Sequence, residues 1–353
     1  MRQVGLRLRY LAERALRLNT ANLIECARQA KRVSKAPLVI IILDMLWCSV
    51  RYEMAFRDYA VWDIRTLSGT ERRTWMTHPK AFRLNSTLNA PNSRELLGDK
   101  PRFYRDFATE IGREWIDAQH ASEEEVSRFL SRHARVMAKP PHGEGGAGID
   151  ILDTTDVLAD VGTTLQSLRE KHQTLLEEVV VQHPDLAALA SHSVNTIRLI
   201  TYRDPRDQFH LIAAVLRIGN QGIIDNFAAG GMFTMLDDDG VALWPAVDKQ
   251  SNIYAKHPVS GVAIQGFRVP HFREAVELVT HASRRLPTVP YVGWDIAITA
   301  ERPILIEANH NSSVFQMKPR ASGIRTGLLH RYRAAVGPGI LDRRSRRRVT
   351  TQV

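Results

Sequence analysis

The sequence contains little cysteine and no long uninterrupted apolar run. Two cysteines, Cys26 and Cys48, occur among 353 residues, too few for a disulfide framework or a cysteine-rich metal site. The longest apolar run, from Leu38 to Val50, is interrupted by Asp44 and falls short of the roughly 20 residues of a membrane-spanning helix. We interpret this run as a buried segment. Because no secretory signal follows the first arginines, we expect a cytoplasmic protein, with peripheral attachment to a membrane as an alternative.

Two patterns that define large enzyme classes are absent as well. The sequence contains no G-x-x-x-x-G-K-[ST] loop, so a P-loop nucleotide-binding protein is not supported. It also contains no G-x-S-x-G turn and no Cys/His pairing in a suitable context. A serine or cysteine nucleophile is therefore not expected.

Excess charge is missing from the centre of the chain. The net charge is +10, but residues 1–36 hold nine Lys/Arg against two Glu, and residues 336–353 hold five Arg against one Asp. The remaining residues are close to neutral, which argues against a nucleic-acid partner. We expect residues 336–353 to form a basic disordered tail.

The N-terminal segment combines apolar and basic residues at helical spacing. Arginines surround the apolar positions Val4, Leu8, Leu11, Ala15 and Leu18. A basic amphipathic helix of this kind could make peripheral contact with an anionic membrane through residues 1–36. The alternative, which we favour, is a helix that packs on the protein and turns a basic face to solvent.

The remaining sequence predicts an α+β protein with antiparallel strand pairs. Residues 1–95 show no alternation of strands and helices and are expected to form a separate, mainly helical region. Further along, we expect helices over Phe103–Ala118, Ser122–His133, Thr163–His172, Asp185–Ala190 and Phe272–Leu286. We expect strands over Val136–Lys139, Ile149–Leu152, Leu175–Val181, Val194–Tyr202, Phe209–Ile218, Gly293–Thr299 and Pro303–Asn309.

The last predicted hairpin carries the strongest indication of a metal site. Alternate residues of a strand share a face, so Glu307 and Asn309 project together, and Asp295 can join them from the preceding strand. Two carboxylates and an amide oxygen suit Mg²⁺ or Mn²⁺ held together with phosphates, whereas zinc fits poorly. The alternative is a half-exposed strand whose polar face points to water, and the segment alone does not decide between the two.

Other segments carry residues that could bind phosphate. Lys139 ends a predicted strand before a glycine-rich loop, whose backbone amides can close over phosphates. The loop glycines are Gly143, Gly145, Gly146 and Gly148. Glu177 and Glu178 interrupt an apolar strand, and Arg198 and Arg217 lie on adjacent predicted strands, where two guanidinium groups could face one phosphate. Each segment alone also has an ordinary explanation, as a plain turn, an exposed strand edge or a surface pair.

The order of these residues along the chain resembles the ATP-grasp superfamily, which includes D-alanine:D-alanine ligase and the ribosomal-protein glutamate ligases. The spacing Asp-x(11)-Glu-x-Asn at Asp295, Glu307 and Asn309 is similar to the metal signature of that superfamily and is the most specific element. More narrowly, roughly residues 40–330 resemble the sugar-transfer-associated ATP-grasp group. The motifs that carry this resemblance are Asp99-Lys100, Lys139-Pro140, Ser193-Val194-Asn195-Thr196-Ile197-Arg198, Asp225-Asn226 and Gly230-Gly231.

The resemblance implies an ATP-grasp fold, in which two α+β subdomains grip ATP, together with a mainly helical N-terminal region. The expected parts are residues 1–95, subdomain A at 96–176 with the glycine-rich loop, subdomain B at 177–335 with the metal site, and the tail at 336–353. The N-terminal α/β substrate subdomain that is usual in such ligases is not visible in residues 1–95. Acceptor binding therefore does not carry over from them.

The resemblance also implies ATP and Mg²⁺ as cofactors, with Mn²⁺ as an alternative metal, and a role for each site residue. Phosphate contacts are implied for Lys100 and Lys139 beneath the glycine loop, adenine contacts for Glu177, Glu178 and the backbone of Val180, and a ribose contact for Asp185. Asn226 belongs to the same nucleotide-binding set. The residues implied to act on the transferred phosphoryl group are Arg198, Arg217 and Lys139, and those implied to bind two Mg²⁺ are Asp295, Glu307 and Asn309.

The implied reaction is an ATP-dependent ligation. A substrate carboxylate takes the γ-phosphoryl group of ATP, and an amine or a thiol then displaces phosphate from the acyl-phosphate. The implied partners are a small-molecule carboxylate and an amine or saccharide, in the building of cell-surface polysaccharide. Two alternatives stay open: a phosphotransferase of the same fold that acts on a hydroxyl, and a non-catalytic membrane-peripheral binding module.

Overall fold

The computed structural model describes residues 19–142, 148–220, 225, 227 and 230–341. The predictions made for residues 1–18, Gly143, Gly145, Gly146, Asn226 and the tail beyond residue 341 lie outside the described residues. The chain divides into two compact units. We call them the helical unit, residues up to 80 with 316–330, and the sheet unit, residues 81–315 with the C-terminal end.

The helical unit is built on α2 (Thr20–Lys31) and α3 (Leu38–Arg51), which pack against each other and against α4 (Phe56–Val61). The shorter helices are η1 (Ile64–Thr66), α5 (Gly69–Arg72) and α15 (Pro319–Ser322). Asp44 on α3 accepts hydrogen bonds from Arg72 at 2.7 Å and 2.9 Å and from the hydroxyl of Tyr59 at 2.6 Å. The acidic residue that interrupts the apolar run is thus neutralised inside the unit.

The apolar run from Leu38 to Val50 forms α3, and one face of this helix is exposed. Ile41, Met45 and Cys48 recur at helical spacing and are buried. The opposite face carries four large apolar side chains that are 46 to 66% exposed: Val39, Ile40, Leu43 and Trp47. The prediction of a buried segment is wrong for this face, because the apolar sequence continues around the helix while the unit packs on one side of it. None of the helices in the described part of the chain has both the length and the apolarity to cross a membrane.

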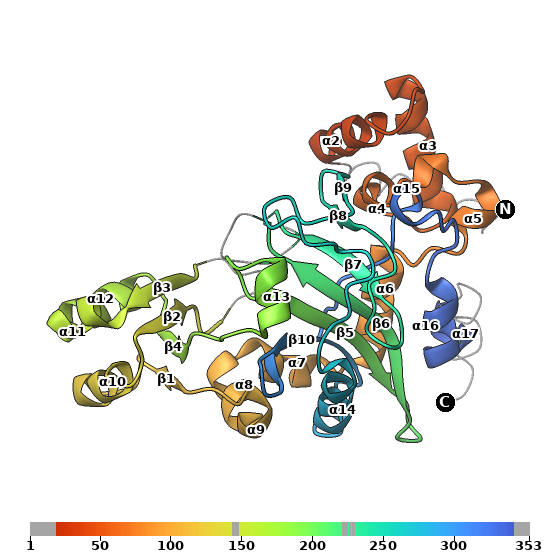
Figure 1. Ribbon diagram of the computed structural model, residues 1–353. Coiled ribbons are helices and arrows are strands. Elements are labelled where there is room, and N and C mark those ends of the chain that lie inside the picture. Colours follow the sequence, from red (N-terminus) through yellow and green to blue (C-terminus); the bar gives the residue numbers. More distant parts are fainter. Residues whose placement is uncertain (1–18, 143–147, 221–224, 226, 228–229, 342–353) are drawn as a thin grey trace. The chain divides into compact units, whose positions relative to one another are not determined.

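The sheet unit contains two antiparallel sheets, of which the smaller has the order β1-β4-β2-β3. Its strands are β1 (Trp115–Asp117), β2 (Arg135–Lys139), β3 (Asp150–Asp153) and β4 (Leu175–Glu178). The helices α10 (Glu123–Leu130), α11 (Thr154–Ala159) and α12 (Val161–Glu170) lie beside these strands (Figure 1). Val126 and Leu130 of α10 and Leu165 of α12 share a core with Val136 and Leu176 of the strands. This core holds β2 and β4 side by side, which places Lys139 near Glu177.

The larger sheet has seven strands in the order β11-β10-β5-β6-β7-β8-β9. They are β5 (Thr196–Arg203), β6 (Phe209–Ile218), β7 (Met232–Leu236), β8 (Ala246–Asp248), β9 (Ile253–Tyr254), β10 (Tyr291–Ile298) and β11 (Pro303–Asn309). The other helices, apart from those of the smaller sheet, are α6 (His78–Leu88), α7 (Pro91–Gly98), α8 (Lys100–Asp106), α9 (Ala108–Ile111), α13 (Pro184–Leu189), α14 (Phe272–Ser283), α16 (Leu329–Val336) and α17 (Pro338–Leu341). Apolar residues of α8, α9, α13 and α14 share one core with β5, β6, β10 and β11. Every residue of β5 and β10 is buried, so the polar side chains on these strands are also withdrawn from water.

The α+β class and the antiparallel pairing are confirmed. The strands Phe209–Ile218 and Pro303–Asn309 begin and end at the predicted residues. The strand predicted over Leu175–Val181 ends at Glu178. The predicted division of the chain at residues 95, 176 and 335 stays a prediction.

The single helix predicted over Phe103–Ala118 is wrong. The chain forms α8 and α9, and α9 ends at Ile111. Gly112 caps it with a φ of 57°, a left-handed conformation that glycine adopts at low cost. Residues Trp115–Asp117 then form β1, which pairs with β4. Pairing with β4 outweighed the helical pattern of the sequence in this segment.

Candidate functional site

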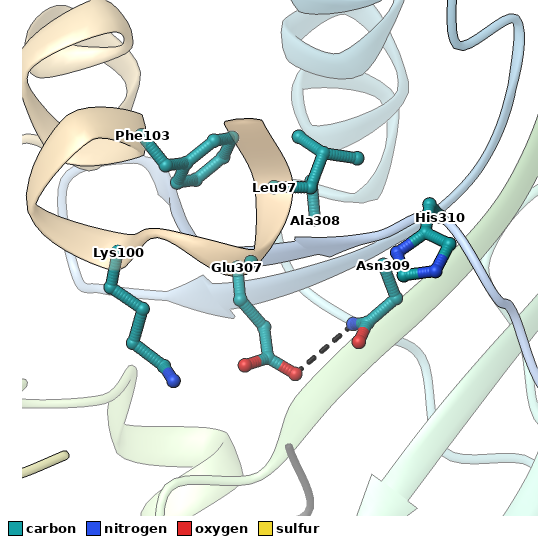
Figure 2. Close-up of a pocket in the computed structure, with 8 residues that line it drawn as sticks. Leu97, Lys100, Phe103, Glu307, Ala308, Asn309 and His310 are labelled. Atoms are coloured by element: carbon teal, nitrogen blue, oxygen red, sulfur yellow. Dashed lines mark hydrogen bonds between the residues drawn. The ribbon is translucent and has the colours of Figure 1, made fainter. Parts of the chain in front are cut away.

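A pocket of about 190 Å³ lies in the sheet unit at the end of β11. The residues that line it are Leu97, Gly98, Lys100, Phe103, Glu307, Ala308, Asn309 and His310. Lys100 is the first residue of α8, where the side chain of Asp99 caps the helix by accepting from the backbone N–H of Arg102. Figure 2 shows the Lys100 and Glu307 side chains extending to the same side of the pocket. A cation and a carboxylate thus converge there from different elements.

Glu307 and Asn309 share a face of β11, as the sequence predicts. The amide nitrogen of Asn309 donates to Oε1 of Glu307 at 3.0 Å (Figure 2). Asp295 is the register partner of Glu307 on β10, so the two carboxylates lie in one row across the strands. Burial raises the pKa of Glu307, and the charge of Asp295 raises it further. The three predicted metal residues are therefore neighbours.

Asp295 is held by two arginines. Nε of Arg198 donates to Oδ1 of Asp295, and Nη2 donates to Oδ2 at 2.7 Å. Nη1 of Arg217 donates to Oδ2 at 2.9 Å. Burial alone would raise the pKa of Asp295, but the charges of Arg198 and Arg217 hold it well below its ordinary value. Both oxygens of this carboxylate already have guanidinium partners.

The donor set fits a hard cation that shares its coordination with phosphate. Glu307 and Asn309 present carboxylate and amide oxygens at the pocket, which is the chemistry that Mg²⁺ prefers. In the described part of the chain, no group of three or more His, Cys, Asp and Glu side chains is arranged to hold a metal. A cation at Glu307 and Asn309 would therefore complete its shell with phosphate oxygens and water, as Mg²⁺ commonly does.

A second network surrounds Glu177 on β4. Nζ of Lys139 lies 2.6 Å from Oε1 of Glu177, and Nε and Nη2 of Arg113 lie 3.1 Å and 2.9 Å from Oε2. The hydroxyl of Tyr104 donates to Oε2 at 2.7 Å and accepts from Lys139 at 2.7 Å. Burial alone would raise the pKa of Glu177, but Arg113 and Lys139 lower it to about 2. Burial lowers the pKa of Lys139, while the charge of Glu177 opposes that shift.

Arg113 also ties this network to strand β11. Its Nη1 donates to the carbonyl of Leu305 at 2.7 Å, two residues before Glu307 on β11. Sequence reasoning missed Arg113 and Tyr104, because both lie in the segment that was predicted to be one helix. Neither belongs to a motif, and their burial follows from the packing of α8 and β1 against the larger sheet.

A third set of buried polar residues supports the arginines from the side of β6. Nη2 of Arg217 lies 3.0 Å from Oδ1 of Asp225, and Oδ2 of Asp225 accepts from the backbone N–H of Thr196 at 2.9 Å. Asn195 donates to the carbonyls of Leu186 and Ala190 at 2.9 Å and 2.8 Å. The Ser193 to Arg198 motif thus fixes the loop before β5 and one of the arginines.

The remaining predicted site residues lie apart from these clusters. Glu178 accepts from the backbone N–H of Glu114 at 3.2 Å, and Val180 lies beyond the end of β4. Asp185 is exposed in the first turn of α13, with an oxygen 3.7 Å from Nδ1 of His183. Gly148 has a φ of 71°, a conformation that a side chain would strain.

Comparison with known proteins identifies the family. Residues 80–332 match the family described as sugar-transfer associated ATP-grasp, which covers more than half of the chain. The comparison with curated proteins gives no match.

Solved structures similar to this chain include those of two ligases and one carboxylase domain. The ATP-grasp ligase PsnB, complexed with a phosphomimetic variant of its minimal precursor, Mg and ADP, is 16% identical over 78% of this chain and 72% of its own, with a TM-score of 0.41. In another PsnB complex the match covers 66% of that chain. D-alanine–D-alanine ligase from Bacillus anthracis is 12% identical over 72% of this chain and 74% of its own, with a TM-score of 0.40. The biotin carboxylase domain of the Hydrogenobacter thermophilus 2-oxoglutarate carboxylase is 16% identical over 69% of this chain and 46% of its own, with a TM-score of 0.41.

The predicted resemblance is confirmed by the family match, although the match begins at residue 80 rather than near residue 40. The matched residues include both antiparallel sheets, the buried row at Asp295 and the Lys139–Glu177 pair. The chain belongs to the sugar-transfer associated ATP-grasp family.

Proposed function

We propose that this protein is an Mg-ATP-dependent ligase that activates a carboxylate as an acyl-phosphate. The observation that carries the proposal is the row Glu307, Asp295 and Arg198 across three strands, beside a pocket that also holds Lys100 and Asn309. Oxygen donors and cations that converge in one site suit a nucleotide triphosphate with its metal. Membership of an ATP-grasp family supports ATP as that nucleotide.

In the proposed first step, a carboxylate oxygen of the substrate attacks the γ-phosphorus of ATP. The bond from that phosphorus to the β,γ-bridging oxygen breaks, and ADP leaves. An amine nitrogen, or a thiol sulfur, then attacks the acyl carbon. The bond from that carbon to the phosphate oxygen breaks, phosphate leaves with the electron pair, and the proton of the nucleophile passes to solvent. Glu307 and Asn309 would hold Mg²⁺, which would neutralise charge on the phosphate oxygens.

The protein contributes mainly position and positive charge. Lys100 and Lys139 are proposed to contact phosphates, and Arg198 and Arg217 to hold the transferred phosphoryl group. Because Asp295 holds both arginines, we propose that it orients them in addition to any contact with metal. Lys139, Arg198 and Arg217 are the proposed catalytic residues.

The adenosine contacts are proposed at the end of β4 and at the start of α13. The Glu177 side chain is committed to Lys139 and Arg113, so adenine is proposed to meet the backbone from Glu178 to Val180 rather than the Glu177 carboxylate. Asp185 is proposed for the ribose and Asn226 for the nucleotide. A saccharide or amine acceptor and a role in cell-surface polysaccharide biosynthesis are proposed because the family is described as sugar-transfer associated. A cytoplasmic location is proposed from the sequence alone.

The first test is thermal unfolding with Mg-ATP, for the wild type and Glu307→Ala. A ligand that binds only the folded state raises the free energy of unfolding by RT ln(1 + [L]/Kd). This is about 2.7 kcal/mol when the free ligand concentration is 100 times Kd. We expect a clear rise in Tm that Glu307→Ala abolishes. If the wild type does not respond to millimolar Mg-ATP, nucleotide binding is refuted and a non-catalytic binding module becomes the better explanation.

The second test separates ligation from phosphotransfer to a hydroxyl, the alternative on the same fold. The ATP is labelled at the β,γ-bridging oxygen. If the carboxylate forms an acyl-phosphate reversibly, the label exchanges into non-bridging positions of ATP before any amine is added. We expect that exchange, and an amide only after the amine is supplied. A stable phosphoester that accumulates without an amine would contradict the ligase.

A further inference from the structure

The helix α3 presents an apolar face that is distinct from its packed face. Val39, Ile40, Leu43 and Trp47 are 66%, 46%, 56% and 58% exposed, and they lie on the side of the helix opposite Ile41 and its buried neighbours. Single exposed apolar residues are ordinary on a protein surface, whereas a contiguous group of large ones marks an interaction site. One helix therefore contributes to the core of the helical unit on one side and exposes an apolar face on the other.

Basic residues stand at both ends of this face. Val39, Leu43 and Trp47 follow one another at intervals of four, and the next step of four reaches the exposed Arg51. The exposed Lys35 precedes the helix at the other end. The acidic residue of α3, Asp44, is turned inward to Arg72. The stripe is thus apolar in the middle and cationic at its ends.

The charge of the whole unit has the same sign. The described residues of the helical unit include thirteen Lys/Arg and six Asp/Glu. The sequence of the preceding residues 1–18 adds five Arg and one Glu. A partner that covers the apolar stripe must therefore tolerate or neutralise positive charge around it.

We propose that the exposed face of α3 docks on the surface of an anionic lipid bilayer. An apolar stripe with a tryptophan and flanking cations suits the boundary between headgroups and acyl chains, where the apolar residues enter and the cations meet anionic headgroups. The helix lies on the membrane without crossing it. This inference is independent of the proposed ligase activity.

Charge also argues against the two other occupants. In a symmetric pair of α3 helices, the cationic ends would lie against cationic ends of the second copy, which is unfavourable. Residues 1–18 are themselves basic and would bring more positive charge beside Lys35 and Arg51. An anionic surface alone complements both the apolar centre and the basic ends.

The experiment is sedimentation of the full-length protein with vesicles of phosphatidylcholine, with or without phosphatidylglycerol. We expect binding to the anionic vesicles that weakens as salt is raised, because exposed charges are screened. Leu43→Glu should reduce the partition coefficient at least about tenfold, since it places a charge where an apolar side chain enters the interface. The matched control is Val259→Glu in the sheet unit, because Val259 is 58% exposed, close to the 56% of Leu43. It should bind as the wild type does.

Two more full-length variants keep the test decisive if Leu43→Glu fails to fold. Lys35→Glu with Arg51→Glu leaves the apolar stripe intact and should weaken binding to anionic vesicles at least about tenfold. The double variant Arg7→Glu with Arg14→Glu tests the contribution of residues 1–18. When Leu43→Glu is added to this double variant, vesicle binding should still fall. Brominated lipid should quench tryptophan emission in the wild type more than in Trp47→Phe.

Several results would overturn the proposal. Absence of sedimentation with anionic vesicles would do so, as would equal losses in Leu43→Glu and Val259→Glu. Binding that is lost in the Arg7/Arg14 variant but unchanged in Leu43→Glu would assign the membrane contact to residues 1–18. A halving of the mass in light scattering for Leu43→Glu, without vesicle binding by the wild type, would assign the face to a second copy of the chain.

Discussion

The ammonium group of Lys139 lies 2.6 Å from a carboxylate oxygen of Glu177, and the two residues are 5% and 3% exposed. Arg113 contacts the second oxygen of the same carboxylate. Two cations and one carboxylate leave this buried cluster with an excess positive charge. An anionic ligand that reaches Lys139 would balance it, so the cluster can hold the lysine in place and still favour phosphate.

Replacing Glu177 by Gln should therefore destabilise the fold strongly. The change leaves Lys139 and Arg113 buried without their counter-ion, and breaking a buried pair in this way costs about 3 kcal/mol or more. We expect a loss of that size in the free energy of unfolding measured with urea. Glu114→Gln is the control, because Glu114 is half exposed and its pairs with Arg132 and His133 lie at the surface. That variant should lose less than about 1 kcal/mol, and equal losses in the two variants would contradict the argument.

Tyr104→Phe should weaken both the fold and the binding of Mg-ATP. The change removes one hydroxyl that donates to Glu177 and accepts from Lys139, a loss of about 1 to 2 kcal/mol in the free energy of unfolding. If the hydroxyl positions Lys139, the rise in Tm caused by Mg-ATP should also shrink. Tyr254→Phe is the control, since that hydroxyl contacts Asp248 at 3.0 Å at the far edge of the sheet. An Mg-ATP response that is as large in Tyr104→Phe as in the control would leave Tyr104 with a purely structural role.

Local pattern was sufficient to predict strand β11 and the residues that share its polar face. Alternation along Ile304 to Asn309 sets which side chains share a face, and the spacing to Asp295 fits a short hairpin, so strand β11 and its polar row follow from period-two geometry. The pairing of β5 with β10, which brings Arg198 to Asp295, joins residues nearly 100 positions apart. The sequence did not predict this pairing; the resemblance implied only that Arg198 and Asp295 both act near the phosphates of ATP.

Burial that depends on long-range packing could not be predicted. Arg113 and Tyr104 look like ordinary residues of a helix, and their partners on β4 and β11 become neighbours only when the two sheets of the unit pack. The same limit applies to α3, whose apolar pattern is the same on the packed and the exposed side. Hydrophobicity predicts that a helix has an apolar face, but not how many of its faces find a partner.

Arg198→Lys should impair phosphoryl transfer more than it impairs stability. Lysine keeps the positive charge but cannot reproduce two parallel N–H donors to the carboxylate of Asp295. We expect kcat for ADP formation to fall at least about a hundredfold. Arg203→Lys is a matched control on the same strand, because Arg203 is also buried but bonds to Ser283 and Asp207. If Arg203→Lys lowers kcat as much, the effect belongs to strand β5 as a whole rather than to Arg198.

The pair His78 and Asp58 in the helical unit should make stability depend on pH near neutrality. Burial alone would lower the pKa of His78, but the hydrogen bond and the charge of Asp58 raise it above its ordinary value. A group whose pKa is raised on folding contributes its full stabilisation of the folded state below its unfolded pKa, about 6.5 for histidine. This contribution is lost as pH rises through the folded pKa. The free energy of unfolding should therefore decline across that window in the wild type and less steeply in His78→Gln. Identical pH profiles would show that the pair is not linked to folding.

Glu307→Gln should raise the concentration of Mg²⁺ that nucleotide binding requires. The change keeps the size of the side chain and one oxygen, but it removes the negative charge that a hard cation needs. Position 307 is next to Asn309, whose amide nitrogen donates to Glu307 at 3.0 Å. We expect the Mg²⁺ concentration for a half-maximal ADP-induced rise in Tm to increase at least about tenfold. Asn309→Ala should shift it in the same direction, because it removes the second oxygen donor. The matched control is Glu301→Gln, since Glu301 is an exposed acid in the β10–β11 turn whose carboxylate accepts from the hydroxyl of Thr299. If all three variants shift the Mg²⁺ requirement alike, the effect reflects net charge around the hairpin, and Glu307 and Asn309 do not hold the metal.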